Sequence, residues 1–237
     1  MTESYFAGAY WKGRSETVEQ CAQRAAALFR FLGRIEPTWN RWCETANSFE
    51  EASRKQVATD ADSLRKHFSR KDWQLGDAFQ YSLWAGVRPD ETSSVSGMCG
   101  SADPWTPSSC VLSPPDEGPL SERILTATVL SQVVREMALV WEPEFGLATS
   151  SEHYGSMSSR PKMGALPGWV MYFSRQRGTV PPLPAPVRVE PVADLGTLVV
   201  LTQERFTVTN PDHVALASKV QQVLDAAGLL HPLRLLS

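Results

Sequence analysis

Four histidines are the first side chains to weigh for catalysis, because histidine is the residue that most readily exchanges protons near neutral pH. His67 lies in a charged segment of helical propensity, and His213 lies in the first turn of a predicted helix, where exposure to solvent explains both. His153 lies in the Ser/Gly-rich stretch 150–156, and catalytic groups are often carried on loops. A small hydrolase or transferase built around His153 is therefore one function that the sequence leaves open.

The sequence motifs that accompany common catalytic chemistries are absent. There is no GxSxG elbow, no HExxH helix, and neither of the glycine patterns, GxGxxG and GxxxxGK[ST], that cradle phosphate. The carboxylate pair Asp60 and Asp62, and the pair that flanks Pro143, lack a DxDxDG context and are typical of turns and surfaces. We therefore predict no enzyme activity, no cofactor and no metal site.

The cysteines, at positions 21, 43, 99 and 110, include no CxxC pair and no histidine at ligand spacing, which argues against zinc. The N-terminus shows no basic stretch followed by an apolar run, so no secretory signal is visible. The longest apolar stretch, 124–140, is interrupted by polar residues and is too short to span a bilayer. We expect a cytoplasmic protein with reduced thiols and no membrane contact.

Charge is distributed unevenly along the chain. The net charge is -3 and the pI is near 5.9, without a basic run interleaved with aromatics, so direct nucleic-acid binding is not expected. Residues 76–150 hold three Lys or Arg against ten Asp or Glu. Most of these acids fall on predicted loops, where they can speed the encounter with a basic partner protein.

One tryptophan in the same region lies between prolines in a loop, where a place in the core explains it less well than a binding anchor does. Tryptophan is enriched among the side chains that dominate protein interfaces. The predicted partner-binding residues are therefore Asp90, Glu91, Asp103, Trp105, Asp116 and Glu117.

The elements that must position these residues follow from hydrophobic periodicity and from capping residues. We predict a first helix capped by Ser15 and ended by Gly33, a helix or helix pair over 48–70, an almost wholly apolar central helix capped by Ser121, and a last helix with Asn210 as its cap, Pro211 as its first residue and Gly228 as its end. The predicted strands cover 5–11, 38–43, 79–85, 94–100, 109–112, 145–149, 169–174 and 195–202. The proline-rich stretch 180–191 is expected to be an extended connector.

Strands and helices alternate without the regular rhythm of a doubly wound fold. The predicted fold is α+β, with a mixed, largely antiparallel sheet, a buried central helix and flanking N- and C-terminal helices. We expect a single domain over residues 1–237, with two fused lobes of about 1–115 and 116–237 as the alternative.

Several separated segments carry a resemblance to a known family. They are the opening Tyr5-Phe-Ala-Gly-Ala-Tyr-Trp with the helix 16–24, Val140-Trp-Glu-Pro, Gly168-Trp-Val-Met-Tyr-Phe, Gly196-Thr-Leu-Val-Val-Leu-Thr, Asn210-Pro and Gly228-Leu-Leu. In this order, across nearly the whole chain, they resemble the bacterial family called immunity protein 52.

The resemblance implies an α+β protein encoded beside toxins of polymorphic and type VI secretion systems, often with a restriction-endonuclease-like toxin domain. Such a protein would bind a cognate nuclease in the producing cell's cytoplasm and block its active site or its access to DNA. The family has no catalytic motif to transfer. Besides an enzyme at His153, an adaptor or chaperone that loads an effector without inhibiting it is the remaining alternative.

Overall fold

A computed structural model of the 237-residue chain describes residues 2–103, 108–157 and 165–232. The chain divides into two compact units: an inserted unit, Lys12–Ser121, and a terminal unit made of Met1–Trp11 and Glu122–Ser237. The alternative of two lobes, about 1–115 and 116–237, groups Met1–Trp11 with the N-terminal half of the chain. In the structure these residues belong to the same unit as Glu122–Ser237. Only a pairing between segments far apart in the sequence, such as Tyr5 opposite Ser150, reveals where these first residues belong.

The inserted unit contains an antiparallel sheet. Its strand order is β7 (Ser108–Ser113), β6 (Thr92–Cys99), β5 (Ala78–Gly86), β2 (Trp42–Glu44) and β3 (Gln56–Val57), with β4 (Gln74–Leu75) also paired to β5. The shorter elements around it are the 3-10 helices η1 (Pro37–Asn40) and η2 (Lys71–Trp73) and the helix α2 (Phe49–Ser53).

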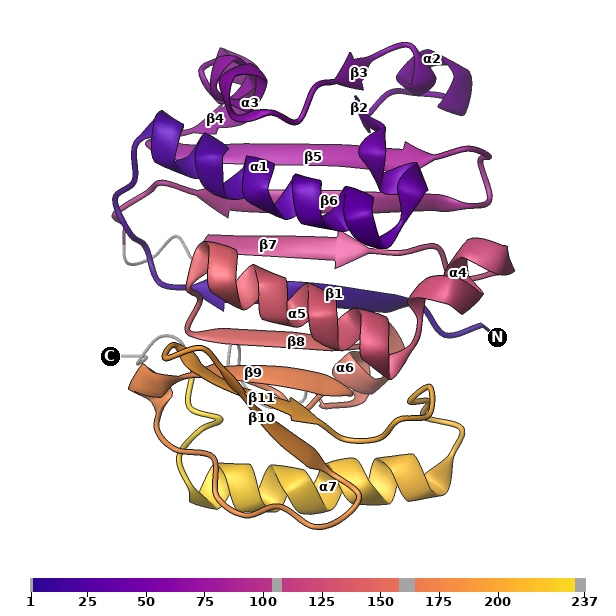
Figure 1. Cartoon of the computed structure of the whole chain (residues 1–237), viewed down its shortest axis with the longest axis vertical. Coiled ribbons are helices and arrows are strands. Elements are labelled where there is room, and N and C mark those ends of the chain that lie inside the picture. The colour runs from indigo at the N-terminus through magenta and orange to yellow at the C-terminus, as the bar shows by residue number, and fades with distance from the viewer. Residues whose placement is uncertain (1, 104–107, 158–164, 233–237) are drawn as a thin grey trace. The chain divides into compact units, whose positions relative to one another are not determined.

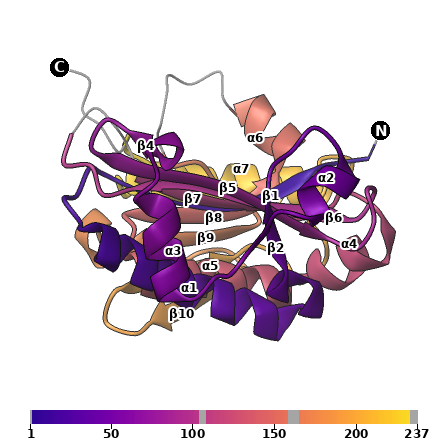
Figure 2. The ribbon, with the colours of Figure 1, turned by 90° about the horizontal axis from the view of Figure 1, so that it is seen from above.

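Helix α1 (Val18–Ile35) covers one face of this sheet, with α3 (Ala61–Phe68) packed beside it (Figures 1 and 2). The α1 residues that face the sheet recur every three to four positions, which is the spacing of one helical stripe. They are Cys21, Ala22, Ala25, Ala26, Leu28, Phe29 and Leu32. Leu64 and Phe68 of α3 are also fully buried, so the core of the unit lies between these helices and one face of the sheet.

The terminal unit contains antiparallel strands in the order β10 (Arg188–Val192), β11 (Gly196–Val200), β9 (Val170–Ser174), β8 (Phe145–Ser150) and β1 (Tyr5–Trp11). Every residue of β8 and β9 is buried, so both faces of these strands are covered. The helices of this part of the chain are α4 (Gly118–Ile124), α5 (Ala127–Trp141), α6 (Ser151–Met157) and α7 (Pro211–Ala226), with the 3-10 helix η3 (Arg175–Arg177).

Helix α5 is the buried central helix that the sequence predicts. It packs against β1, β8 and β9, and Trp141 at its end stacks on Trp11 with ring centroids 5.2 Å apart. At the C-terminal end of the chain, Asn210 caps α7 and Pro211 occupies its first position, as predicted. The α+β class with a largely antiparallel sheet, a buried central helix and flanking N- and C-terminal helices is thus confirmed.

Two predicted boundaries of α1 are wrong. The capping side chain is Thr17 rather than Ser15. Gly33 does not end the helix, which continues to Ile35. A side chain at Gly33 would collide with Asn40, whose Nδ2 donates to the Gly33 carbonyl at 2.9 Å. The glycine at this position therefore permits the close approach of η1 and does not terminate the helix.

The predicted cap of the central helix is also wrong. Helix α5 begins after Thr126, whose hydroxyl accepts a hydrogen bond from the Val129 amide at 3.2 Å. Ser121 lies inside the separate helix α4 and donates to the Asp116 carbonyl at 3.1 Å. Both serine and threonine suit a cap, and only the backbone path decides which of them takes that role.

Two segments differ from the expected strand pattern. Residues 38–43 form most of η1 and the start of β2; η1 has Pro37 at its start, and the Thr38 amide donates to the capping Glu36 carboxylate at 3.2 Å. The proline-rich stretch 180–191, expected to be a connector, contributes most of β10, an edge strand of the terminal unit. Edge strands tolerate proline because one side of their backbone has no partner strand, which explains Pro191.

Candidate functional site

One face of the sheet in the inserted unit is open. Along β5, Tyr81, Leu83 and Ala85 are buried beneath α1, whereas the alternate positions point to the opposite face and are exposed or half-buried. The same alternation continues through β6 and β7. This open face consists of Gln80, Ser82, Trp84, Ser94, Ser96, Met98, Ser109, Val111 and Ser113.

Serine hydroxyls form the middle of the open face. Ser82 and Ser96 lie directly opposite each other in the register of β5 and β6, and both are exposed. Ser94 lies opposite Ser113 in the register of β6 and β7. Among the described residues, none forms a hydrogen bond with the hydroxyls of these four serines, which leaves them available to solvent or to a partner.

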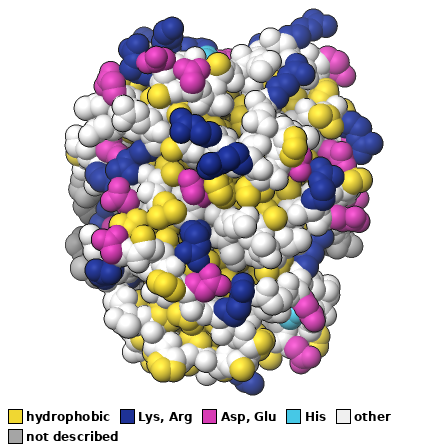
Figure 3. Space-filling model, in the orientation of Figure 1, with side chains coloured by type: hydrophobic (Ala, Val, Ile, Leu, Met, Phe, Trp, Pro, Cys, Tyr) yellow, Lys and Arg dark blue, Asp and Glu magenta, His cyan; other side chains and the backbone are white. Residues whose placement is uncertain are grey.

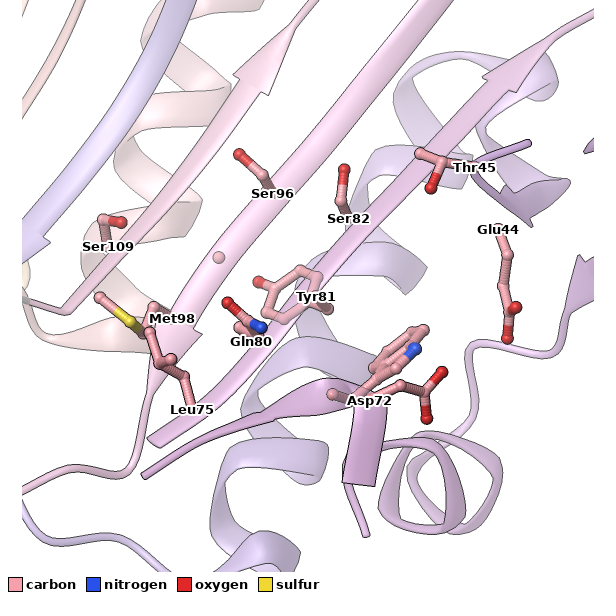
Figure 4. A pocket seen from close by; sticks show the side chains of 12 residues that line it. Glu44, Thr45, Asp72, Leu75, Gln80, Tyr81, Ser82, Ser96, Met98 and Ser109 are labelled. Carbon is pink, nitrogen blue, oxygen red and sulfur yellow. The ribbon is translucent and has the colours of Figure 1, made fainter. Parts of the chain in front are cut away.

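The first of two hollows lies over this face and has a volume of about 740 Å³. Its floor includes Ser82, Ser96 and Met98, and Leu75 from β4 lies at its side (Figure 4). Trp73 from η2 also lines it. The Leu75 side chain is 56% exposed. The hollow therefore combines hydroxyl groups with accessible apolar surface.

A second hollow, of about 560 Å³, lies toward α2. Phe49 of α2 and Trp84 of β5 line it, with ring centroids 5.1 Å apart. Asp116, from the loop after β7, lines it as well. Thr45 borders both hollows, so the two are neighbours along the open face. Figure 2 shows β4 and α2 at the two ends of the face that lies opposite α1.

Carboxylates dominate the electrostatics of the first hollow. Arg70, beside the hollow, donates to Glu44 and forms a bidentate pair with Asp72 at 3.1 and 2.5 Å. The hydrogen bonds from Arg70 hold the pKa of Asp72 below its ordinary value and keep this group ionised near neutral pH. His67 lies 3.5 Å from Glu44, but burial lowers the pKa of His67, which favours its neutral form.

The opposite, helical side has a different surface. Figure 3 shows Lys and Arg side chains intermixed with Asp and Glu on the face over α1, without a field of one sign. Mixed charge of this kind is typical of a surface that only needs to stay soluble. In contrast, the described side chains that line the two hollows include Glu44, Asp72 and Asp116 and no Lys, Arg or His.

The acidic residues predicted from the sequence fall at two places. Asp90, Glu91, Asp116 and Glu117 lie on two loops at one end of the inserted sheet, and a side chain at Gly118 would contact the carboxylate of Glu91. Asp90, Asp116 and Glu117 are exposed. Glu91 is only 8% exposed, with Oε1 3.3 Å from Arg88, so it differs from the solvent-facing position expected of it.

Asp103 lies apart from the other acids. It follows the far end of β6, whose eight residues span about 26 Å at roughly 3.3 Å per residue. Its amide is tied to the Ser101 hydroxyl at 3.0 Å. Trp105, the predicted anchor, lies outside the described residues. The open serine face was missed, because alternation shows that a strand has two different faces but not that one of them stays uncovered.

His153, the catalytic candidate, is a buried residue of α6 with 2% exposure. Its Nε2 lies 3.2 Å from the Pro167 carbonyl, and its ring packs edge-on against Phe206 at 4.8 Å. Burial lowers the pKa of His153, although the hydrogen bond to Pro167 opposes this shift. His153 lines neither of the two hollows described above. A buried, carbonyl-bound imidazole is a packing group, and this geometry gives no support to an active site there.

Three further properties of the described residues bear on function. Within residues 2–103, 108–157 and 165–232, no group of three or more His, Cys, Asp or Glu is arranged to hold a metal ion. All four cysteines are buried free thiols. Among the described helices, none alone has the length and apolar character to cross a membrane; α4 and α5 meet that criterion only jointly, across a 70° bend.

Comparison with known proteins identifies the family. The family model of immunity protein 52 matches residues 3–233. A solved structure, the Pseudomonas aeruginosa T6SS protein PA0821, is similar with a TM-score of 0.53 and 12% identity, over 93% of this chain and 76% of that chain. At this identity the likeness shows a shared fold only. No curated protein matches the sequence. Because the family model covers nearly its whole length, the chain belongs to the immunity protein 52 family.

Proposed function

We propose that this immunity protein neutralises a nuclease toxin, of the restriction-endonuclease-like DNase class, by covering the toxin's active site or the path of its DNA. Membership in the family makes the chain an immunity protein of a toxin system and implies a cognate toxin as partner. The fold that it shares with a T6SS protein supports a toxin delivered by type VI secretion. The protein would act in the cytoplasm of the cell that produces the toxin.

The acidic end of the inserted sheet is the observation that carries the nuclease assignment. Asp90, Asp116 and Glu117 are exposed there on two adjacent loops. An enzyme that cuts DNA must present Lys and Arg side chains to the phosphates of its substrate. An acidic protein surface is complementary to such a site, competes with DNA for it, and speeds the encounter between the two proteins.

The mechanism is stoichiometric binding. An immunity protein has to leave almost no free toxin, so the complex should have a dissociation constant near or below the nanomolar range, about -12 kcal/mol or stronger. Such affinity comes from a few buried aromatic or arginine anchors inside a polar rim. Trp105 remains the anchor proposed from the sequence, and Asp103 belongs to the same loop.

A DNA-cleavage assay tests the proposal. The toxin encoded beside this gene is purified, its cleavage of plasmid DNA is measured, and the immunity protein is added in increasing amounts before or after the DNA. The proposal predicts that cleavage stops at an equimolar ratio and that DNA added first slows inhibition. A toxin that does not cut DNA would refute the nuclease assignment. Unchanged cleavage despite complex formation would identify the protein as an adaptor.

A further inference from the structure

We infer that the toxin docks on the open serine face of the inserted unit, and that a protruding toxin segment carrying Lys or Arg enters the two hollows. This inference rests on the proposed function, because it takes the cognate toxin as the occupant. It adds the surface that is used and the chemistry of the segment that is bound.

The open serine face is exposed and hollowed. An antiparallel sheet can present one face to water without any partner, so openness alone is not evidence of binding. Here, however, the face is hollowed in two places and carries accessible apolar groups. Leu75 is 56% exposed beside the first hollow, and the half-buried Phe49 and Trp84 line the second. A hollow with accessible apolar lining is suited to bind a partner.

The two hollows have the size and the lining that a loop of a partner protein requires. Volumes of about 740 and 560 Å³ are large enough to receive several side chains of a partner. The half-buried rings of Trp84 and Phe49 in the second hollow, and the exposed Leu75 side chain in the first, offer apolar surface to the stem of a long side chain. The unpaired hydroxyls of Ser82 and Ser96 offer hydrogen bonds to the backbone of an extended segment. A protein loop uses all of these features together.

The side chains around the first hollow carry a net negative charge. Glu44 and Asp72 border the first hollow and Asp116 borders the second, while none of the described lining residues is cationic. Arg70 pairs with both Glu44 and Asp72 and leaves that cluster with one net negative charge. His67, beside them, is held toward its neutral form. The first hollow therefore keeps a net negative charge, which favours a cationic side chain over an anionic one.

The test places a positive charge in the middle of the face. The variant Ser82→Arg with Ser96→Arg should weaken the complex with the neighbouring-gene toxin at least about tenfold, because like charge and bulk now oppose the incoming segment. Both serines are exposed, so the thermal midpoint of the free protein should stay unchanged. Ser218→Arg, at an exposed serine of α7, is the matched control and should bind like the wild type. A dissociation constant within about twofold of wild type for the double variant would overturn the inference, since an interface-centre change should exceed this.

A second measurement remains informative if the arginine variant misfolds. All four native cysteines are buried, so Ser96→Cys introduces an accessible thiol with a very small change in side-chain size. Its alkylation should slow strongly when the same toxin is bound, whereas that of Ser218→Cys should not. Equal alkylation of the Ser96→Cys thiol with and without bound toxin would contradict docking on this face.

These outcomes separate the inference from the proposed function. If the wild-type protein inhibits the toxin and the Ser82→Arg, Ser96→Arg variant inhibits equally well, the function stands and the docking face is wrong. If the wild-type protein neither binds nor inhibits the toxin, the proposed function itself fails.

Discussion

One buried carboxylate of this chain, that of Glu16, is held by two guanidinium groups. Glu16 has a side chain only 4% exposed, and its Oε1 lies 3.2 Å from Arg14 and 2.8 Å from Arg24. Its backbone amide donates to the Gly100 carbonyl at 3.2 Å, which ties the start of α1 to the end of β6. A charge in such a place is stable only while its partners remain, since desolvation of a lone carboxylate is costly.

Arg24→Met should therefore destabilise the protein by about 1–3 kcal/mol, less than for a fully buried pair because Arg24 is partly exposed and Arg14 remains. Chemical denaturation measures the change in the free energy of unfolding. Arg30→Met, at an exposed position of the same helix, is the control and should be nearly neutral. Equal effects of the two substitutions would show that Glu16 does not depend on its pair.

His153 gives a pH prediction. Burial lowers its pKa in the folded protein, so the unfolded chain binds a proton that the folded chain resists. Stability should fall as the pH drops below about 6.5, the ordinary pKa of histidine. His153→Gln, whose amide can still donate to the Pro167 carbonyl, should lessen this loss. The measurement is the thermal midpoint of both proteins across this pH range. The pKa of His67 is lowered as well, and His67 is present in both proteins, so only the difference between their pH dependences reports on His153. Thermal midpoints that fall equally with pH in the two proteins would contradict the assignment to His153.

At the scale of single residues, the sequence indicates which types of side chain are buried better than it indicates what surrounds each of them. Trp39, Trp42 and Trp169, which lie in segments predicted to be strands, are all fully buried. The sequence predicts a loop around His153, but the segment forms α6 and buries the imidazole against Phe206. The residue that covers His153 lies more than fifty positions away in the sequence, and local composition carries no information about it.

At the scale of elements, β5 and β6 depend on a close contact at a glycine. Gly97 lies opposite Tyr81 in the register, and a side chain at Gly97 would collide with the Tyr81 ring. That ring cannot move away easily. It is buried, it packs against Phe29 and Phe68, and its hydroxyl donates to the Cys110 sulfur at 3.4 Å.

Gly97→Ala should therefore destabilise the protein by about 1–3 kcal/mol, the usual cost of overpacking a core. Gly155→Ala in α6 is the control, since a side chain there meets nothing within 4 Å. This control should be neutral or stabilising, because alanine favours a helix over glycine by roughly 0.5–1 kcal/mol. Equal denaturation curves for wild type and Gly97→Ala would mean that the Tyr81 ring is not fixed as described.

Helices with a long hydrophobic periodicity are predicted correctly. Helix ends and edge strands, which depend on the path of the backbone, are not. The stripe of α1 and the apolar run of α5 identified both helices. The caps were misplaced, because Ser15 and Thr17, or Ser121 and Thr126, are chemically equivalent candidates in the sequence. β10 was missed because prolines disfavour strands, and only its pairing with β11 reveals an edge strand.

At the scale of the whole molecule, charge should govern the rate of association. Asp116 and Glu117 are exposed in the loop after β7, and their reversal to lysine should slow binding of a basic toxin, most strongly at low salt. Stopped-flow kinetics measure this rate. Reversal of Glu19 and Asp62, exposed acids of α1 and α3, is the control and should have a smaller effect. An association rate that does not change with salt would argue against steering.

The α+β class and the family could be predicted from the sequence, because both depend on the order of many short hydrophobic segments. The docking face could not. It depends on which side of β5, β6 and β7 is covered by α1, and on the neighbouring positions of Trp73, Leu75 and Phe49 beside the uncovered side. These are properties of packing, which alternation along a single strand does not contain.

The central claim is that this protein acts by stoichiometric binding and not by turnover. Its most direct test follows residual toxin activity over time with a fixed, sub-stoichiometric amount of immunity protein. A binding inhibitor should remove a fraction of activity equal to the molar ratio, after which the remainder stays constant. Activity that continues to decline toward zero, accompanied by a change in the mass of the toxin, would show that the protein is an enzyme and contradict this account.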